Sequence, residues 1–197
     1  MFTGIIKELG SVAAVEAADD GARLRIRADL ASELGPGESV AVNGACLTAT
    51  SVGGGEFGAD VMHQTLSLTT LGDVEPSSRV NLELPLRPTD RLSGHIVRGV
   101  VEGRASILSF TPESDAIIAR FRTPPELLRY MVVKGPVTID GASLTIIDKT
   151  ADSFAVSLVQ YTQAHTNLMR KQPGNSVNIE TDIIARYVET LLQARAS

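Results

Sequence analysis

Apolar and polar residues alternate strictly over residues 23–28, where Leu24, Ile26 and Ala28 are interleaved with three arginines. A period of two places side chains of one kind on one face, so this segment is predicted to be a half-buried β-strand. Further strands are predicted at 4–12, 39–49, 56–62 and 80–84. Elements of about five to eight residues, separated by frequent turn signals, are typical of a small β-barrel or sandwich.

Turn and capping residues divide these strands. Asp19, Asp20 and Gly21 predict a hairpin turn. Residues 29–34 are predicted to form a short helix capped by Asp29, which the Gly-Pro-Gly at 35–37 ends. A second short helix is predicted at 124–131, where the opening prolines are tolerated because the first helical amides lack intrahelical partners.

The chain contains an internal repeat. The sequence VNGACLTA at 42–49 returns as IDGASLTI at 139–146, an offset of 97 residues. VNLE at 80–83 returns as VNIE at 177–180 with the same offset, and the apolar segment after Gly4 is matched after Gly99 at an offset of 95. A repeated sequence predicts a repeated fold, so we expect two like domains joined through the polar segment 87–94.

The last segment has no counterpart in the repeat. Between 182 and 195 its apolar residues form a stripe typical of a helix with one apolar face, at positions Ile183, Ile184, Tyr187, Val188, Leu191 and Leu192. Asp182 at its start favours the positive end of the helix. The apolar face is expected either to pack back on the barrels or to pack on other copies of the chain.

The composition of the chain argues against some classes of partner and location. Hydrophobic residues make up 43% of the chain, aromatic residues only 4%, and there is no Trp, so the cores must be built from aliphatic side chains. The net charge of −5 argues against a nucleic-acid partner. A single cysteine excludes an internal disulfide and is typical of the cytoplasm. No secretory leader and no membrane span are expected.

The repeated motif places polar groups on one face. If both copies are strands, Cys46 and Thr48 share a face, as do Ser143 and Thr145, while the intervening leucines face the other way. A thiol, hydroxyls and strand amides facing one way could bind a polar heterocycle. The alternative is that the glycine and small residues serve a tight approach of two strands.

Other motifs of catalysis are not found. The histidines His63, His95 and His165 lack metal-ligand spacing, and one cysteine cannot build a structural zinc site, so no metal is expected. His63 is expected in a loop. No glycine-rich phosphate loop and no G-x-S-x-G elbow occurs. Lys134 and Asp182 are either site residues or solvated charges.

Four stretches resemble riboflavin synthase: MFTGII at 1–6, NGACLT at 43–48, the region 134–145 with DGASLT, and VNIETD at 177–182. The resemblance covers nearly the whole chain. It implies an all-β fold of two six-stranded antiparallel Greek-key barrels related by a pseudo-twofold axis, plus a C-terminal helix that gathers three chains. The implied parts are a lumazine-binding barrel at 1–92, a second at 93–181 and the oligomerisation helix at 182–197.

The resemblance also implies a reaction. Riboflavin synthases are transferases that dismutate two molecules of 6,7-dimethyl-8-ribityllumazine into riboflavin and 5-amino-6-ribitylaminopyrimidinedione by four-carbon transfer, without a cofactor. The reaction starts with loss of a proton from the C7 methyl group. The working site pairs the first barrel of one subunit with the second barrel of the next. A homotrimer, a lumazine or flavin ligand and lumazine synthase are the implied partners.

Site residues are carried over by position. The polar candidates for proton transfer or activation are Cys46, His95, Ser143 and Asp182. The first pocket is expected to use Gly4, Ile5, Ile6, Cys46, Leu47, Thr48, Asp60, Val61, Met62, His63, Gln64 and Thr65, with Phe2 and Ser39 nearby. The second is expected to use Gly99, Val100, Val101, Lys134, Ser143, Leu144, Thr145, Val159, Gln160, Tyr161, Thr162, Gln163 and Ala164, with Asp182 nearby.

The sequence departs from the family pattern before the second barrel. The family reads G-G-H-x-x-S-G-H where this chain has SGHIVRGV, so His95 is kept, while Arg98 and Val100 replace a small residue and a histidine. Arg98 is expected to bring bulk and charge near a pocket, and Gln160 stands where the family has proline. Three readings follow: a working synthase, a protein that binds lumazine or flavin without turnover as antenna proteins of the superfamily do, or an enzyme for another lumazine or flavin transformation.

Overall fold

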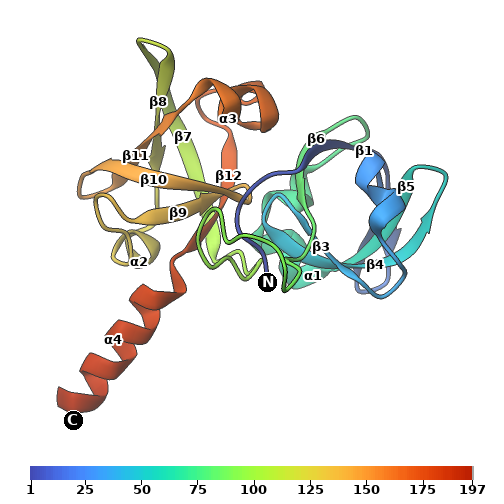
Figure 1. The fold of residues 1–197 in the computed structure, drawn as a ribbon, viewed down its shortest axis with the longest axis horizontal. Helices are drawn as coiled ribbons and strands as arrows, with labels where there is room; N and C mark the ends of the chain where they lie inside the picture. Colours follow the sequence, from blue (N-terminus) through green and yellow to red (C-terminus); the bar gives the residue numbers. More distant parts are fainter. Residues whose placement is uncertain (197) are drawn as a thin grey trace.

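The computed structural model describes residues 1–196 and consists of two closed β-barrels side by side, with one helix projecting from the second (Figure 1). The first barrel contains β1 (Glu8–Ala18), β2 (Gly21–Arg27), β3 (Ser39–Val42), β4 (Ala45–Gly53), β5 (Glu56–Met62) and β6 (Arg79–Glu83). The second contains β7 (Gly103–Glu113), β8 (Ala116–Arg122), β9 (Pro136–Ile139), β10 (Ala142–Lys149), β11 (Ser153–Leu158) and β12 (Ser176–Thr181). Residue 197 of the predicted terminal helix lies outside the described residues.

The two barrels have the same strand order. Around the first barrel the strands run β1-β2-β5-β4-β3-β6, and around the second β7-β8-β11-β10-β9-β12, with antiparallel pairing throughout. The predicted repeat and fold class are therefore confirmed. The predicted boundary after residue 92 falls between β6 and β7 and stays a prediction.

Helices and 3₁₀ turns lie between the strands and after the last one. They are α1 (His63–Leu68), α2 (Pro125–Leu128), α3 (Gln160–His165), α4 (Ile183–Ala196) and the 3₁₀ turns η1 (Asp29–Glu33), η2 (Thr70–Asp73) and η3 (Leu168–Arg170). His63 thus begins a helix and does not lie in a loop. The predicted cap by Asp29 is wrong: Glu8 accepts the backbone N–H groups of Asp29 and Leu30, each at 2.8 Å. A carboxylate at this end satisfies two amides that lack helical partners.

The alternation of the sequence is visible in the packing. Leu24 and Ile26 are fully buried, whereas the arginines of β2 are exposed and pair with acidic residues on β5. Each core is aliphatic with a few phenylalanines, among them Phe57 in the first barrel and the stacked Phe121 and Phe154 in the second. Aliphatic side chains with a few phenylalanines are therefore sufficient to fill both barrels.

The repeated motif begins with a tight hairpin turn in each barrel. Asn43 and Gly44 have φ of 46° and 81°, and Asp140 and Gly141 have φ of 44° and 83°. Two successive positive φ values define the type I′ turn, which Asn-Gly and Asp-Gly favour. The two turns touch: a Cβ on Gly44 would lie 2.8 Å from the nitrogen of Gly141. The glycines therefore serve an approach of two backbones, the second alternative above.

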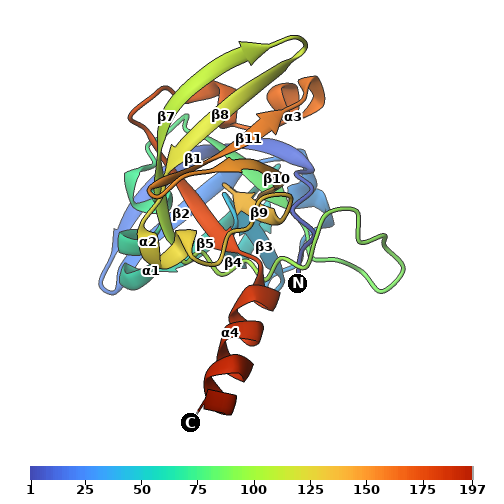
Figure 2. The ribbon, with the colours of Figure 1, turned by 90° about the vertical axis from the view of Figure 1, so that its left-hand side faces the viewer.

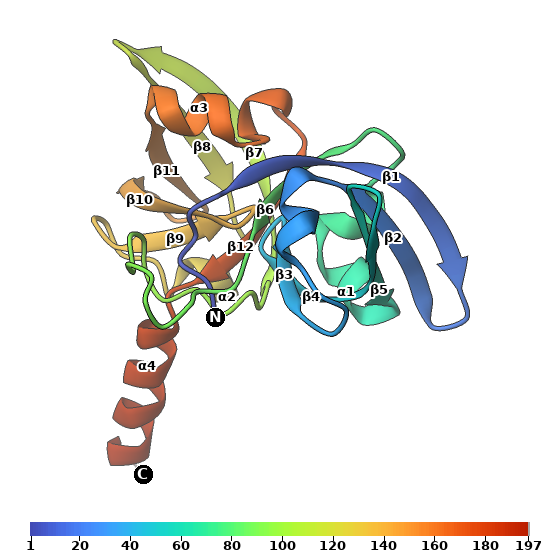
Figure 3. The same ribbon diagram turned by 45° about the vertical axis from the view of Figure 1, so that its right-hand side comes forward.

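The segments that precede the two barrels, residues 2–7 and 97–102, each pass to the opposite barrel (Figure 3). They are called the crossing segments below. Phe2 and Val97 form an isolated antiparallel bridge. Beyond it, Ile6 packs in the core of the second barrel and Val101 in the core of the first. The predicted strand over 4–12 therefore begins only at Glu8, because residues 2–7 pass between the barrels.

The terminal helix α4 projects away from both barrels (Figure 2). Its polar side is tied to the second barrel, since Arg186 pairs with Glu102 at 2.6 Å and Tyr130 donates to Glu189 at 2.5 Å. Its apolar side is exposed at Ile184, Tyr187, Val188, Leu191 and Leu192. Of the two alternatives for this face, packing back on the barrels is wrong. Among the helices of residues 1–196, none has the length and apolar character of a membrane span.

Candidate functional site

The face of β4 predicted to carry chemistry is open. Cys46 and Thr48 are exposed while Leu47 between them is buried in the barrel, as a period of two requires. Ser39 is half-buried and lies opposite Thr48 on the neighbouring strand. The predicted shared face is therefore present on the outside of the first barrel.

A cavity of about 220 Å³ lies beside Cys46. Gln64 and Thr65 of α1 line one side, and Gly99 and Val100 line another. The Cys46 N–H donates to the Gly99 carbonyl at 2.9 Å. The cavity is thus built from the first barrel together with the segment that leads into the second.

The corresponding face of β10 holds a histidine–serine pair. Ser143 is half-buried, Leu144 is buried and Thr145 is exposed. His95 Nδ1 lies 2.7 Å from Ser143 Oγ, and its Nε2 lies 3.3 Å from Thr138 Oγ1. A hydroxyl within hydrogen-bond reach of a histidine is the arrangement that activates a nucleophile or relays a proton.

Burial sets the protonation of His95. It lowers the pKa of the imidazole below its ordinary value, and the charge of Asp182 opposes this shift. The neutral imidazole is therefore favoured at neutral pH and can accept a proton. Asp182 also accepts the N–H of Ile184 at 3.0 Å and so caps α4.

The crossing segments reverse the predicted assignment of residues to pockets. Gly4, expected in the first pocket, accepts the Ser143 N–H at 2.7 Å and so lies against the second barrel. Gly99, expected in the second, lies at Cys46 in the first. Ile5 and Ile6 follow Gly4, and Val100 and Val101 follow Gly99. The prediction assumed that each segment packs against the barrel that follows it in the sequence. In the structure each segment instead packs against the other barrel.

Two larger hollows lie at pseudo-equivalent places on the two barrels. One of about 690 Å³ is bounded by the β1–β2 turn and by Met62, His63, Gln64 and Thr65. One of about 510 Å³ is bounded by the β7–β8 turn and by Val159, Gln160 and Tyr161. The Tyr161 ring stacks on His165 with centroids 3.9 Å apart. Gln64 and Thr65 also line the Cys46 cavity, so these two hollows adjoin.

The other predicted site residues differ in their burial and in their partners. Asp60 pairs with Arg23 at 2.7 Å on the outer surface, and this hydrogen bond lowers the pKa of the carboxyl. Gln163 donates to the Leu158 carbonyl at 2.7 Å. Phe2, Ile6, Leu47, Val61, Val101 and Leu144 are buried, Thr162 is half-buried, and Ala164 and Lys134 are exposed.

Arg98 was expected to bring bulk and charge near a pocket; it precedes Gly99, which lines the Cys46 cavity, but Arg98 does not itself line it. Its guanidinium lies 3.2 Å from Glu102 and 3.5 Å from Glu180. Two carboxylates therefore hold its charge beside the crossing segment. Val100, which stands where the family has histidine, does line the cavity and is about half exposed.

Sequence reasoning missed two buried carboxylates. Glu83 and Glu180 end the repeated VNLE and VNIE segments, which were read only as a repeat. Each accepts three hydrogen bonds from a crossing segment. Both alternate with core residues, Leu82 and Ile179, so they face out of their barrels, and no local pattern indicated that the crossing segments bury them. No group of three metal-ligating side chains occurs in residues 1–196.

Comparison with known proteins agrees with this duplicated architecture. The sequence profile described as lumazine binding domain matches residues 3–85 and again 98–182. The chain is 42% identical to riboflavin synthase of Actinobacillus pleuropneumoniae, with 98% of this chain and 90% of the relative covered. It is 43% identical to riboflavin synthase of Mycobacterium tuberculosis (strain ATCC 25618 / H37Rv), with 98% and 99% covered.

The fold matches a solved structure with ligand. The crystal structure of LumP complexed with 6,7-dimethyl-8-(1'-D-ribityl) lumazine superposes with a TM-score of 0.84 at 25% identity, covering 92% of this chain and 99% of that one. Two matched domains and relatives similar over their full length agree with the two barrels. The chain belongs to the riboflavin synthase family and is built from two lumazine binding domains.

Proposed function

We propose that this chain is a riboflavin synthase that converts two molecules of 6,7-dimethyl-8-ribityllumazine into riboflavin and 5-amino-6-ribitylaminopyrimidinedione. The observation that carries the proposal is the pair of like sites at Cys46 and Ser143, on barrels of the same strand order. A dismutation uses one substrate twice, as four-carbon donor and as acceptor. Two similar pockets that hold the two rings together contribute through proximity.

We assign proton uptake to His95 and Ser143. In the lumazine the C7 methyl group is acidic because the electron-poor ring delocalises the resulting charge. A neutral imidazole 2.7 Å from the Ser143 hydroxyl can accept that proton, directly or through Ser143. Burial lowers the pKa of His95 and the charge of Asp182 opposes this shift, so Asp182 stabilises the imidazolium formed.

We place the second ring at Cys46. There the thiol and Thr48 face outward, and the cavity offers the main chain of 99–101. In this arrangement the C-terminal barrel of one chain works with the N-terminal barrel of a neighbour, as the family resemblance implies. The roles of Cys46 and of the main-chain contacts are part of the proposal.

We also propose a homotrimer formed through α4. Five apolar side chains on its free face support this, since contiguous exposed apolar surface marks interaction sites. A cytoplasmic location is proposed from the exposed, unpaired thiol of Cys46, which a reducing compartment preserves. A complex with lumazine synthase stays a prediction of the resemblance.

Binding without turnover is the second candidate. It is favoured by Val100, which presents an apolar group at the Cys46 cavity, and by the likeness to LumP, whose structure contains the lumazine. An incubation with 6,7-dimethyl-8-ribityllumazine separates the two. The enzyme releases one pyrimidinedione per riboflavin, whereas a binding protein retains fluorescent ligand unchanged. Absence of both turnover and binding would overturn both candidates.

Two matched variants sharpen the test. Cys46→Ser alters only the first pocket, and Ser143→Ala alters only the second. Because dismutation needs both rings, each single variant is expected to lower turnover while leaving binding at the other pocket. Full turnover in both variants would contradict the assignment of the pockets.

A further inference from the structure

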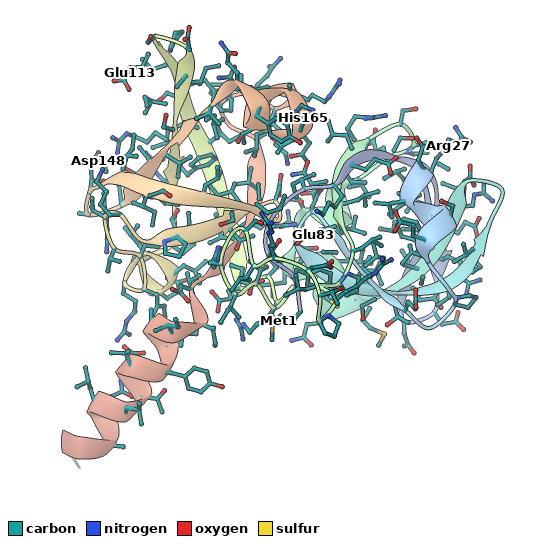
Figure 4. The ribbon with its side chains drawn as sticks, viewed as in Figure 1. Met1, Arg27, Glu83, Glu113, Asp148 and His165 are labelled. Carbon is teal, nitrogen blue, oxygen red and sulfur yellow. The ribbon has the colours of Figure 1, made fainter. Side chains whose placement is uncertain are left out.

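The first crossing segment is held by a buried carboxylate of the first barrel. Glu83, at the end of β6, is 3% exposed and lies between the two barrels (Figure 4). It accepts the Thr3 N–H at 2.7 Å, the Thr3 hydroxyl at 2.8 Å and the Gly4 N–H at 3.0 Å. Three donors on one carboxylate fix both the place and the direction of this segment.

The second crossing segment is held in the same way. Glu180, in β12, is 2% exposed and accepts the N–H groups of Arg98, Gly99 and Val100 at 2.8, 3.0 and 2.9 Å. The Arg98 guanidinium also pairs with it, and Glu102 lies close enough for its charge to act on it. The two glutamates are equivalent in the repeat, at an offset of 97 residues.

Each carboxylate is coupled to the pocket of the opposite barrel. The Gly4 N–H is bound to Glu83, and the Gly4 carbonyl accepts the Ser143 N–H. The Gly99 N–H is bound to Glu180, and the Gly99 carbonyl accepts the Cys46 N–H. One residue therefore separates each buried charge from the site on the other barrel.

The crossing segments pack tightly against the strands that carry Ser143 and Cys46. A Cβ on Gly4 would lie 2.6 Å from Ser143 Cβ, and a Cβ on Gly99 would lie 2.6 Å from Cys46 Cβ. Both glycines also have a positive φ, near 80°. A segment packed this closely transmits a displacement at the carboxylate to the strand that carries the site.

We propose that Glu83 and Glu180 are positioning residues that act across the barrels: Glu180 of the second barrel sets the pocket at Cys46, and Glu83 of the first sets the pocket at Ser143. The proposal rests on the proposed function only in taking these two places as ligand pockets. Burial raises the pKa of both carboxyls, and the N–H groups that donate to them oppose this shift.

The test uses Glu180→Gln with Glu83→Gln as its matched control in the full-length chain. Glutamine keeps the shape but turns one acceptor into a donor that faces backbone N–H groups. Because Cys46 is the single cysteine of the chain, its reaction with a neutral thiol reagent reports the first pocket alone. Loss of one hydrogen bond to a charged group is expected to change this rate about tenfold in Glu180→Gln. Glu83→Gln should leave it near the wild-type value.

A general loosening of the structure predicts a different result. Both variants remove the same group from equivalent places, so general loosening would change the Cys46 rate equally in both. An equal change, or no change in Glu180→Gln, would overturn the proposal. A Cys46→Ser, Ser143→Cys background moves the reporter to the other pocket, and there the order of the two variants should reverse.

A milder pair keeps the test usable if the glutamine variants do not fold. Glu180→Asp and Glu83→Asp retain the charge and shorten its reach, and the same crossed pattern is expected with smaller changes. The thiol readout needs no turnover. Failure of wild-type protein to form riboflavin would therefore overturn the proposed function without affecting the crossed pattern.

Discussion

Phe2 and Val97 hydrogen-bond to each other in both directions. The Phe2 N–H donates to the Val97 carbonyl at 2.7 Å, and the Val97 N–H donates to the Phe2 carbonyl at 3.2 Å. The two residues are equivalent in the repeat, at an offset of 95, so this bridge lies on the pseudo-twofold axis. From here the two segments diverge toward opposite barrels, which joins the halves of the chain into one unit.

Phe2→Ala is expected to destabilise the whole chain. The Phe2 side chain is fully buried between the barrels, beside Ala41 and Val97. Removal of a buried phenylalanine typically costs about 3–5 kcal/mol in the free energy of unfolding. Chemical denaturation measures the loss, with Met1→Ala, at an exposed side chain, as the control. A loss below about 1 kcal/mol would mean that the bridge does not contribute to stability.

Gly44→Ala is expected to cost more than Gly54→Ala. Both residues have a positive φ, and an alanine there costs about 1–2 kcal/mol. At Gly44 the added carbon also meets the Gly141 nitrogen at 2.8 Å, whereas at Gly54 nothing lies within 4 Å. The difference between the two variants in thermal unfolding therefore measures the contact of the two turns. Equal effects would show that the turns can separate freely.

His95→Ala is expected to lower riboflavin formation by about 10²–10⁴-fold, the range for loss of a general base. In the wild type the rate should be constant above the ordinary histidine pKa. It should fall as the pH drops through the lower pKa of the folded protein, where the imidazole becomes protonated. A steady-state pH profile measures this. A rate that rises on acidification would contradict the role of neutral His95.

The lowered pKa of His95 also makes the stability of the folded chain depend on pH. Because burial lowers the pKa of His95 in the folded chain, its contribution to stability is present above the ordinary histidine pKa. The contribution is lost as the pH falls through the folded value. Unfolding measured over this range should therefore show a smaller pH dependence in His95→Ala. An unchanged dependence would place the titration elsewhere.

Leu191→Glu is expected to disrupt the trimer. Leu191 is 65% exposed on the apolar face of α4, and a carboxylate there would have to be desolvated in a helix-to-helix contact. Sedimentation should give smaller particles, as should truncation after Thr181. Thr190→Glu, on an exposed neighbouring position, is the control and should leave the mass unchanged. Unchanged mass for Leu191→Glu and for the truncation would refute assembly through α4.

Local patterns in the sequence determined the secondary structure and the face on which each side chain lies. The alternation in 23–28 and the faces of Cys46 with Thr48 and of Ser143 with Thr145 follow from the period of a strand, which depends only on neighbouring residues. The repeat required equal strand order in the two halves. The apolar stripe of α4 likewise followed from helical spacing.

The tertiary structure alone decided how distant segments combine. It placed Gly4 at Ser143 and Gly99 at Cys46, used Glu8 as the cap of η1, and buried Glu83 and Glu180 under the crossing segments. These pairings join residues up to about 140 positions apart through backbone amides, which every residue possesses and which therefore leave no mark in the sequence. A repeat states that two halves are alike, but only the packing about their shared axis determines which half completes which pocket.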